Sequence, residues 1–175
     1  MIAFAPFMPS QEHRNLAGAV IDSLEFAREG RRQAGQVAVR DLARLADQLV
    51  DFSGALAWCL QGERTRDGEH LLHLNVEGDL GLRCQRCLGA LRFQLQVVST
   101  LRLIKPGATW PEDDLEDDSA DAVDAEREMA LLPLIEEEVL LALPIAPRHE
   151  RCSPPAPADK EQEPSPFAVL AKLKK

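Results

Sequence analysis

Two short pairs of residues in this sequence could bind a metal ion. Cys84 and Cys87 form a Cys-x2-Cys pair, and His149 and Cys152 form a His-x2-Cys pair after 61 intervening residues. A spacing of two residues lets both side chains of a pair point into one small volume, which a tetrahedral metal or a redox pair requires. Three sulfurs and one imidazole are a complete ligand set for structural zinc, with no open coordination position. We therefore predict that these four residues bind zinc.

The long gap between the pairs leaves two other interpretations open. In the first, Cys84 and Cys87 only tighten a turn, while His149 and Cys152 lie on an exposed connection. In the second, the Cys-x2-Cys pair belongs to a thiol oxidoreductase. Reactive pairs of that kind usually lie at a helix N-terminus, which lowers the thiol pKa. Here the cysteines lie between two predicted strands, so we expect that activation to be absent and rank this function below zinc binding.

The residues on both sides of the cysteines alternate between apolar and polar types. A period of two with one apolar face indicates half-buried strands, and two in succession predict an antiparallel hairpin with the cysteines at its turn. A strand through Leu56, Trp58 and Leu60 would complete a three-stranded meander, and Gly35–Val39 predicts a brief strand before it. The alternating apolar positions of the hairpin are Leu72, Leu74, Val76, Leu80 and Leu82, then Leu91, Phe93, Leu95, Val97, Leu101 and Leu103.

Three helices are expected in the same domain. Asp22 and Glu25 form a capping box for a helix over residues 23–29, and Gly30 can end it. Helical spacing from Asp41 to Leu49 predicts a second helix that covers the sheet. A third helix begins at Pro133, with three glutamates near its start, and ends before Pro144. The fold class is therefore α+β: an antiparallel sheet or meander with covering helices.

The charge of the chain is concentrated in one segment. The 175 residues carry a net charge of −9, yet residues 112–138 alone contain 13 acidic residues and one basic residue. We expect one domain over residues 1–152 that contains a mobile acidic loop at 106–128. A Pro-rich linker at 153–165 and a short helix at 166–175 follow it. Phe167, Leu170 and Leu173 share one face of that helix and could dock on the domain or on a partner.

The sequence also bears on compartment and catalysis. No stretch approaches the roughly 20 apolar residues that span a bilayer, and Met1–Pro9 lacks the basic start of an export signal. We expect a cytoplasmic protein with reduced cysteines. Hydrolase, zinc-protease, phosphate-loop and dinucleotide motifs are missing, so we expect no enzymatic activity. A weak basic set along the hairpin could contact RNA: Arg83, Arg86, Arg92 and Arg102.

Four separated motifs in the same order resemble the YceD family of large ribosomal RNA subunit accumulation proteins. They are Cys84-Gln-Arg-Cys87-Leu88, Glu136-Glu-Glu-Val-Leu-Leu-Ala-Leu-Pro144, Pro147-x-His149 with Cys152, and Pro166-Phe-Ala-Val-Leu-Ala-Lys-Leu-Lys174. The resemblance covers roughly residues 20–175, and the acidic loop departs from it most. It implies a bacterial cytosolic protein, or an organelle counterpart, that supports accumulation of the large-subunit ribosomal RNA and has no known catalytic activity.

Two mechanisms fit that expectation. In the first, the sheet and its arginines bind large-subunit ribosomal RNA or a pre-ribosomal particle. In the second, the acidic loop and the C-terminal helix hold a basic ribosomal protein until it is delivered. The composition alone does not separate them, because the basic hairpin favours the first and the acidic run favours the second.

Overall fold

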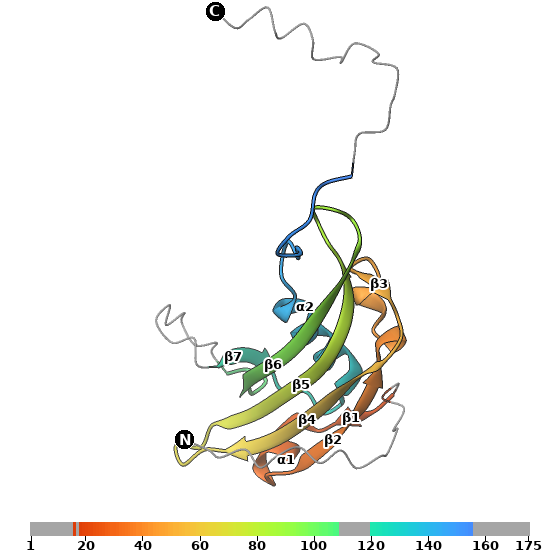
Figure 1. Ribbon diagram of the computed structural model, residues 1–175. Helices are drawn as coiled ribbons and strands as arrows, with labels where there is room; N and C mark the ends of the chain where they lie inside the picture. Colours follow the sequence, from red (N-terminus) through yellow and green to blue (C-terminus); the bar gives the residue numbers. More distant parts are fainter. Residues whose placement is uncertain (1–15, 17, 109–119, 156–175) are drawn as a thin grey trace, which may run out of the picture.

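The computed structural model describes residue 16, residues 18–108 and residues 120–155, and these residues form an α+β fold as predicted (Figure 1). Long strands form a twisted sheet, and the longer helix lies against one of its faces. The elements in chain order are β1 (Val20–Ile21), α1 (Ser23–Arg28), β2 (Arg32–Ala38), η1 (Val39–Asp41), η2 (Ala43–Leu45), β3 (Leu49–Asp51), β4 (Ala55–Arg64), β5 (His70–Arg83), β6 (Ala90–Ile104), β7 (Asp121–Asp124), β8 (Met129–Ala130) and α2 (Leu131–Ala142).

The main sheet of the described residues has the strand order β2-β4-β5-β6-β7, and β3 pairs with the far end of β5. Every pairing is antiparallel except that of β6 with β7, which is parallel. The β5–β6 hairpin runs from the pair Leu71–Arg102 to the pair Arg83–Ala90. The predicted meander is therefore confirmed as β4-β5-β6, and its hairpin turn contains both cysteines of the first pair.

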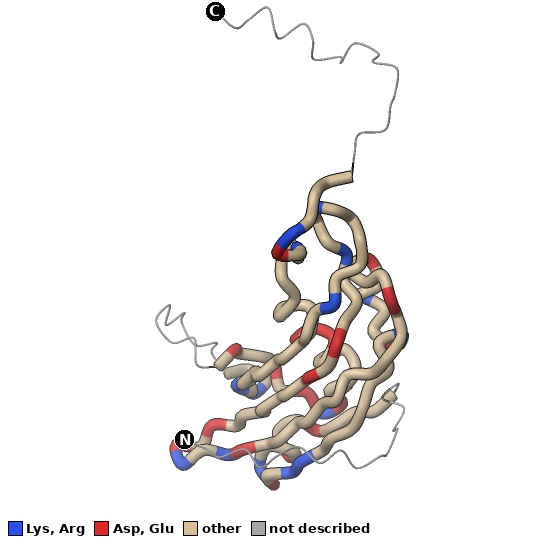
Figure 2. Tube along the Cα trace, viewed as in Figure 1, with Lys and Arg blue, Asp and Glu red and all other residues tan. Residues whose placement is uncertain are grey.

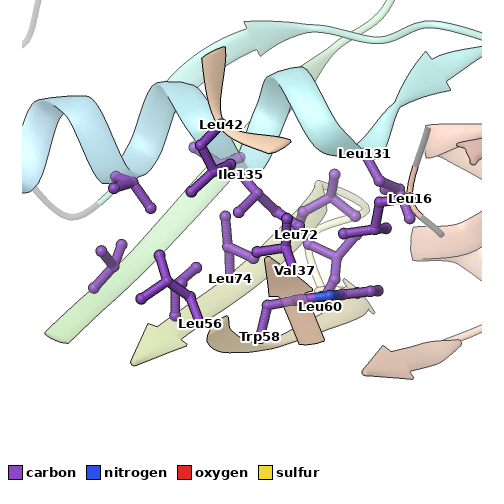
Figure 3. Packing of buried hydrophobic residues seen from close by; sticks show 14 of the residues in the cluster. Leu16, Val37, Leu42, Leu56, Trp58, Leu60, Leu72, Leu74, Leu131 and Ile135 are labelled. Carbon is purple, nitrogen blue, oxygen red and sulfur yellow. The ribbon is translucent and has the colours of Figure 1, made fainter. Parts of the chain in front are cut away.

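The alternating apolar residues of the hairpin form the core. Leu72, Leu74 and Leu101 are fully buried on one face of the sheet, and α2 covers that face with Leu131 and Ile135 (Figure 3). Complete burial of one such side chain stabilises the fold by about 1.5–3 kcal/mol. This core holds the sheet and α2 together.

The first helix forms as the capping box predicts. The side chain of Asp22 accepts a hydrogen bond from the backbone N–H of Glu25 at 3.0 Å, and Gly30 follows the helix with a φ of 62°. Residue 62 on β4 must be glycine for the helix to pack this closely. A Cβ atom at Gly62 would lie 2.4 Å from the carbonyl oxygen of Phe26 in α1.

The prediction of a helix from Asp41 to Leu49 is wrong. This segment forms the two 3-10 turns η1 and η2 and then β3, in which Leu49 pairs with Leu82. Leu42 and Leu45 are buried as their spacing predicted. Two contacts outweigh the helical preference of this segment. Leu49 pairs with Leu82 in the sheet. The backbone N–H of Arg44 donates a hydrogen bond of 2.7 Å to the carboxylate of Glu136 in α2.

The third predicted helix exists, but it begins earlier. α2 starts at Leu131, so its three glutamates lie in the middle of the helix rather than near its start. Glu136 and Glu138 are buried, and only Glu137 is exposed. Glu136 is the acceptor for the N–H of Arg44, and Glu138 accepts from the hydroxyl of Ser99 on β6. The glutamates are thus contacts between α2, η2 and the sheet.

The acidic segment also differs from its expected form. Residues 121–124, predicted as loop, form the edge strand β7 beside β6. Residues 109–119 lie outside the described residues. So do residues 156–175, which include most of the predicted linker and the predicted docking face of Phe167, Leu170 and Leu173.

Candidate metal centre

The fold brings the two predicted ligand pairs together. Cys84 follows the last residue of β5, and Cys87 lies in the turn before β6. After α2, the chain passes Pro144 and returns to this turn, where the backbone N–H of Gln85 donates to the carbonyl oxygen of Pro147 at 2.8 Å (Figure 1). The second pair therefore lies on a largely exposed connection, as the alternative interpretation had it, but this connection lies against the hairpin turn.

The four side chains form a compact cluster. The ligand atoms of Cys84, Cys87, His149 and Cys152 all lie within 4.8 Å of one another. The sulfurs of Cys84 and Cys152 are 3.8 Å apart, and the sulfur of Cys87 is 3.3 Å from Nδ1 of His149. Tetrahedral zinc with bonds of about 2.3 Å to sulfur holds two sulfurs about 3.8 Å apart, whereas a disulfide joins them at about 2.05 Å. The cluster could hold zinc, as the sequence predicted.

Backbone groups orient the ligands. Nε2 of His149 lies 3.0 Å from the carbonyl oxygen of Ala90, so the tautomer that donates there leaves Nδ1 as the metal-facing acceptor. The turn itself is closed by two backbone hydrogen bonds of 2.9 Å, from Cys84 N–H to Gly89 and from Leu88 N–H to Cys84. The carbonyl oxygens could not be recognised from the sequence, because every residue has one.

The surroundings of Cys84 and Cys152 shift the pKa values of these two thiols in opposite directions. The backbone N–H of Cys87 is the main cause that lowers the pKa of the Cys84 thiol to about 5, against an opposing effect of burial, and the amides of His149 and Arg86 also lower it. Burial raises the pKa of the Cys152 thiol, and the neighbouring sulfurs of Cys84 and Cys87 raise it further. Three thiolates this close repel one another, and a divalent cation between them removes that repulsion.

This lowered pKa differs from the expectation that Cys84 would lack activation. The hairpin turn supplies backbone N–H donors as a helix N-terminus would, although no helix begins there. The sulfur with the lowered pKa is nevertheless inaccessible, because Cys84 is fully buried. Thiol–disulfide exchange requires access to the attacking sulfur, so the geometry favours metal binding over an oxidoreductase.

The four arginines predicted to contact RNA do not form one patch. Arg83 and Arg86 lie beside the cluster, and Arg86 donates to the carbonyl oxygen of Cys152 at 3.3 Å. Arg92 makes two hydrogen bonds to Asp79, of 2.7 and 3.2 Å. Arg102 lies 3.4 Å from Glu69, ten residues along β6 from Arg92 and therefore about 33 Å away. The charges of the last two are offset by carboxylates.

Two further arginines, which were not among the predicted RNA contacts, lie at the same end of the molecule. Arg148 and Arg151 alternate with the second ligand pair, and both are exposed. Their proximity to the hairpin turn depends on the long-range return of the chain after α2, so no local pattern indicated it. No helix in the described residues combines the length and the apolar character needed to cross a membrane.

Comparisons with known proteins agree with the motifs. The model of the family described as "Large ribosomal RNA subunit accumulation protein YceD" matches residues 72–174, a range that contains both halves of the cluster. The chain is similar to the large ribosomal RNA subunit accumulation protein YceD of Haemophilus influenzae, with 28% identity over 166 residues. That alignment covers 88% of this chain and 94% of the relative. No solved structure matches the chain.

Proposed function

Because the chain belongs to the YceD family, whose name ties it to accumulation of the large ribosomal subunit RNA, we propose that it is a non-enzymatic ribosome-biogenesis factor that binds this RNA or an assembly intermediate. The observation that carries the proposal is the family match over residues 72–174, which contains the whole metal cluster. The ribosomal RNA of the large subunit, alone or in a pre-ribosomal particle, is the proposed partner.

In this proposal, zinc has a structural role. Cys84, Cys87, His149 and Cys152 would fill all four positions of a tetrahedral ion and leave none for a substrate or an attacking water. The ion would lock the segment after α2 onto the hairpin turn. The S–S separation of 3.8 Å and the contact of His149 with Ala90 support this assignment.

Arg83 and Arg86 are the proposed RNA contacts of the hairpin. Arg83 is exposed at the end of β5, and Arg86 lies in the turn. When arginine side chains contact phosphates, the counterions condensed on the RNA are released, so the affinity of this mode of binding falls steeply with salt concentration. Arg92 and Arg102 are weaker candidates, since Asp79 and Glu69 already offset their charges.

The decisive experiment measures the ratio of large- to small-subunit ribosomal RNA in bacterial cells that lack their own gene of this family. We expect the wild-type chain to restore the ratio and the zinc-free Cys84→Ser/Cys152→Ser variant to fail. The matched control is Cys59→Ser, which changes a buried cysteine outside the cluster. Failure of the wild-type chain would refute the function, and full restoration by the zinc-free variant would refute the role of zinc.

A second experiment separates the RNA mechanism from the protein-adaptor mechanism. In the RNA mechanism, Arg83→Glu/Arg86→Glu abolishes binding to a transcript of the large-subunit RNA precursor. In the adaptor mechanism, deletion of residues 110–118 abolishes capture of a basic ribosomal protein and leaves RNA binding unchanged. This deletion spares β7, which a deletion of the whole acidic run would remove.

A further inference from the structure

The end of the molecule at the metal cluster has a charge opposite to that of the chain. We define the tip as residues 83–89 and 145–152. It contains four arginines and one glutamate, for a net charge of +3, whereas the whole chain carries −9. Figure 2 shows basic residues on both segments of the tip. The hairpin contributes Arg83 and Arg86, and the segment after α2 contributes Arg148 and Arg151.

The arginines of the tip are available to a ligand. Within the part of the chain that the structure describes, no carboxylate forms an ion pair with Arg83, Arg148 or Arg151. Some exposed arginines elsewhere are neutralised, as Arg31 is by Glu29 and Arg92 by Asp79. An exposed group with an excess of like charges lowers stability by self-repulsion, and the single acidic residue of the tip, Glu150, offsets only part of it.

The tip also exposes one apolar side chain from each segment. Leu88 is 55% exposed and Ile145 is fully exposed. Leu88 has a φ of 62°, a left-handed conformation that glycine adopts at little cost and a branched side chain adopts under strain. Since the side chain of Leu88 does not enter the core, folding would favour glycine here. An exposed, strained leucine therefore points to a contact outside the chain.

We propose that the tip is a binding surface for single-stranded RNA, in which Arg148 and Arg151 contact phosphates together with Arg83 and Arg86, and Leu88 and Ile145 contact unpaired bases. The inference rests on the proposed function and extends it to a surface built from two distant segments. A single strand is the form of RNA that fits, because its bases are free to meet apolar side chains, whereas a duplex presents mainly phosphates and hydroxyls.

A metal ion bound to the cluster would link the two halves of this surface. The contacts that hold the second segment against the turn include the ligand cluster and the hydrogen bonds from Gln85 to Pro147 and from Arg86 to Cys152. Loss of the ion would free Arg148 and Arg151 from the first two arginines. RNA affinity should then fall to that of the hairpin alone, although the sheet stays folded.

The test measures binding of a fluorescein-labelled single-stranded RNA, by anisotropy over a series of salt concentrations. We expect Arg148→Glu/Arg151→Glu to weaken binding by about tenfold or more and to reduce the salt slope by about one per arginine. The matched control is Arg64→Glu/Arg66→Glu, which makes the same charge change at the exposed β4–β5 turn, at the opposite end of the long strands. The control should change affinity less than about twofold, because it lies beyond a screening length from the tip.

A third variant separates binding from folding. Leu88→Gly relieves the left-handed strain, so it should keep or raise the thermal stability while it weakens RNA binding by about threefold to tenfold. Zinc content is measured for every variant, so that a loss of the ion is not mistaken for a loss of contact. Unchanged RNA affinity in Arg148→Glu/Arg151→Glu, or an equal loss in the Arg64→Glu/Arg66→Glu control, would overturn the inference.

Two further arms distinguish this inference from the proposed function. Polyglutamate replaces RNA in the first, and binding as tight as that of RNA would assign the tip to an acidic protein and overturn the inference. In the second, a duplex of the same sequence should bind more weakly than the single strand, and the reverse order overturns it. If the wild-type chain restores ribosomal RNA in cells but the tip variants bind RNA normally, the inference fails and the proposed function stands.

Discussion

The sheet and the tip are held together by different forces. Around β4, β5 and α2, fully buried leucines fill the interface, and neighbouring strands pair over long antiparallel registers. In the tip, only Cys84 and Pro147 are buried. Backbone hydrogen bonds and the four potential metal ligands hold its two segments. The hydrophobic effect therefore stabilises the sheet, whereas in our proposal a bound metal ion would stabilise the tip.

The two segments of the tip bury little apolar area of their own. Short polar segments cannot bury enough apolar area to offset their loss of conformational entropy. In our proposal, an ion bound to the four potential ligands would supply that free energy locally and leave the surrounding side chains exposed. Four predictions test how independent the two regions are.

Metal loss should give the largest difference between them. In Cys152→Ser, we expect zinc content to fall from one per chain toward zero, and amide protection in residues 84–89 and 145–152 to fall by about tenfold or more. Amides of β4 and β5 should keep their protection, because the core does not include the cluster. Hydrogen exchange by mass spectrometry gives both readouts, with Cys59→Ser as the control. Equal loss of protection in the sheet would contradict the independence of the regions.

A cavity in the core should have the converse effect. Leu74→Ala removes a fully buried side chain, so the free energy of unfolding should fall by about 2–5 kcal/mol in urea titrations. Zinc content of the folded variant should stay at one per chain. Val98→Ala, on the exposed face of β6, should change stability by less than about 0.5 kcal/mol. A Leu74→Ala protein that folds but loses zinc would show that the core shapes the ligand cluster.

Two glutamates of α2 allow a comparison between a buried and an exposed contact of the same residue, Arg44. Glu136→Ala leaves the backbone N–H of Arg44 without its acceptor in a partly buried site, which should cost about 1–3 kcal/mol. Glu137→Ala breaks an exposed ion pair with the Arg44 side chain and should cost about 0–0.5 kcal/mol. Thermal and urea unfolding of the two variants measure the difference. Equal effects would mean that the buried contact does not position η2.

The smallest expected effect is a pH dependence at His70. Burial lowers the pKa of this histidine, and the nearby charges of Lys105, Arg64 and Arg28 lower it further. As the pH falls below about 6.5, the unfolded chain takes up a proton that the folded chain resists, so stability decreases until the folded pKa is passed. The wild-type protein should therefore lose more stability than His70→Gln between neutral pH and that point.

The quantity to measure is the difference in free energy of unfolding between the wild type and His70→Gln, since protonation of the cluster affects both proteins equally. Urea unfolding at a series of pH values provides it. Parallel curves for the wild type and His70→Gln would contradict the depressed pKa. The zinc content of both proteins should be the same at every pH, because His70 lies at the end of β5 opposite the tip.

Elements that depend on contacts between neighbouring residues could be predicted from the sequence alone. The period of two on both sides of Cys84 predicted the hairpin, and Asp22 with Glu25 predicted the first helix. The four potential metal ligands could also be predicted from residue type and spacing. These features depend on neighbours within a few residues, where backbone geometry and side-chain chemistry leave little choice.

Only the tertiary structure decided what depends on residues far apart in the chain. Helical spacing at 42–49 gave way to 3-10 turns and β3, because Glu136 and Leu82 offered better partners than a helix did. The return of the chain after α2 brought the second ligand pair across 61 residues to the first. The approach of the two ligand pairs follows from the packing of α2 on the sheet. Short-range sequence patterns do not indicate such long-range packing.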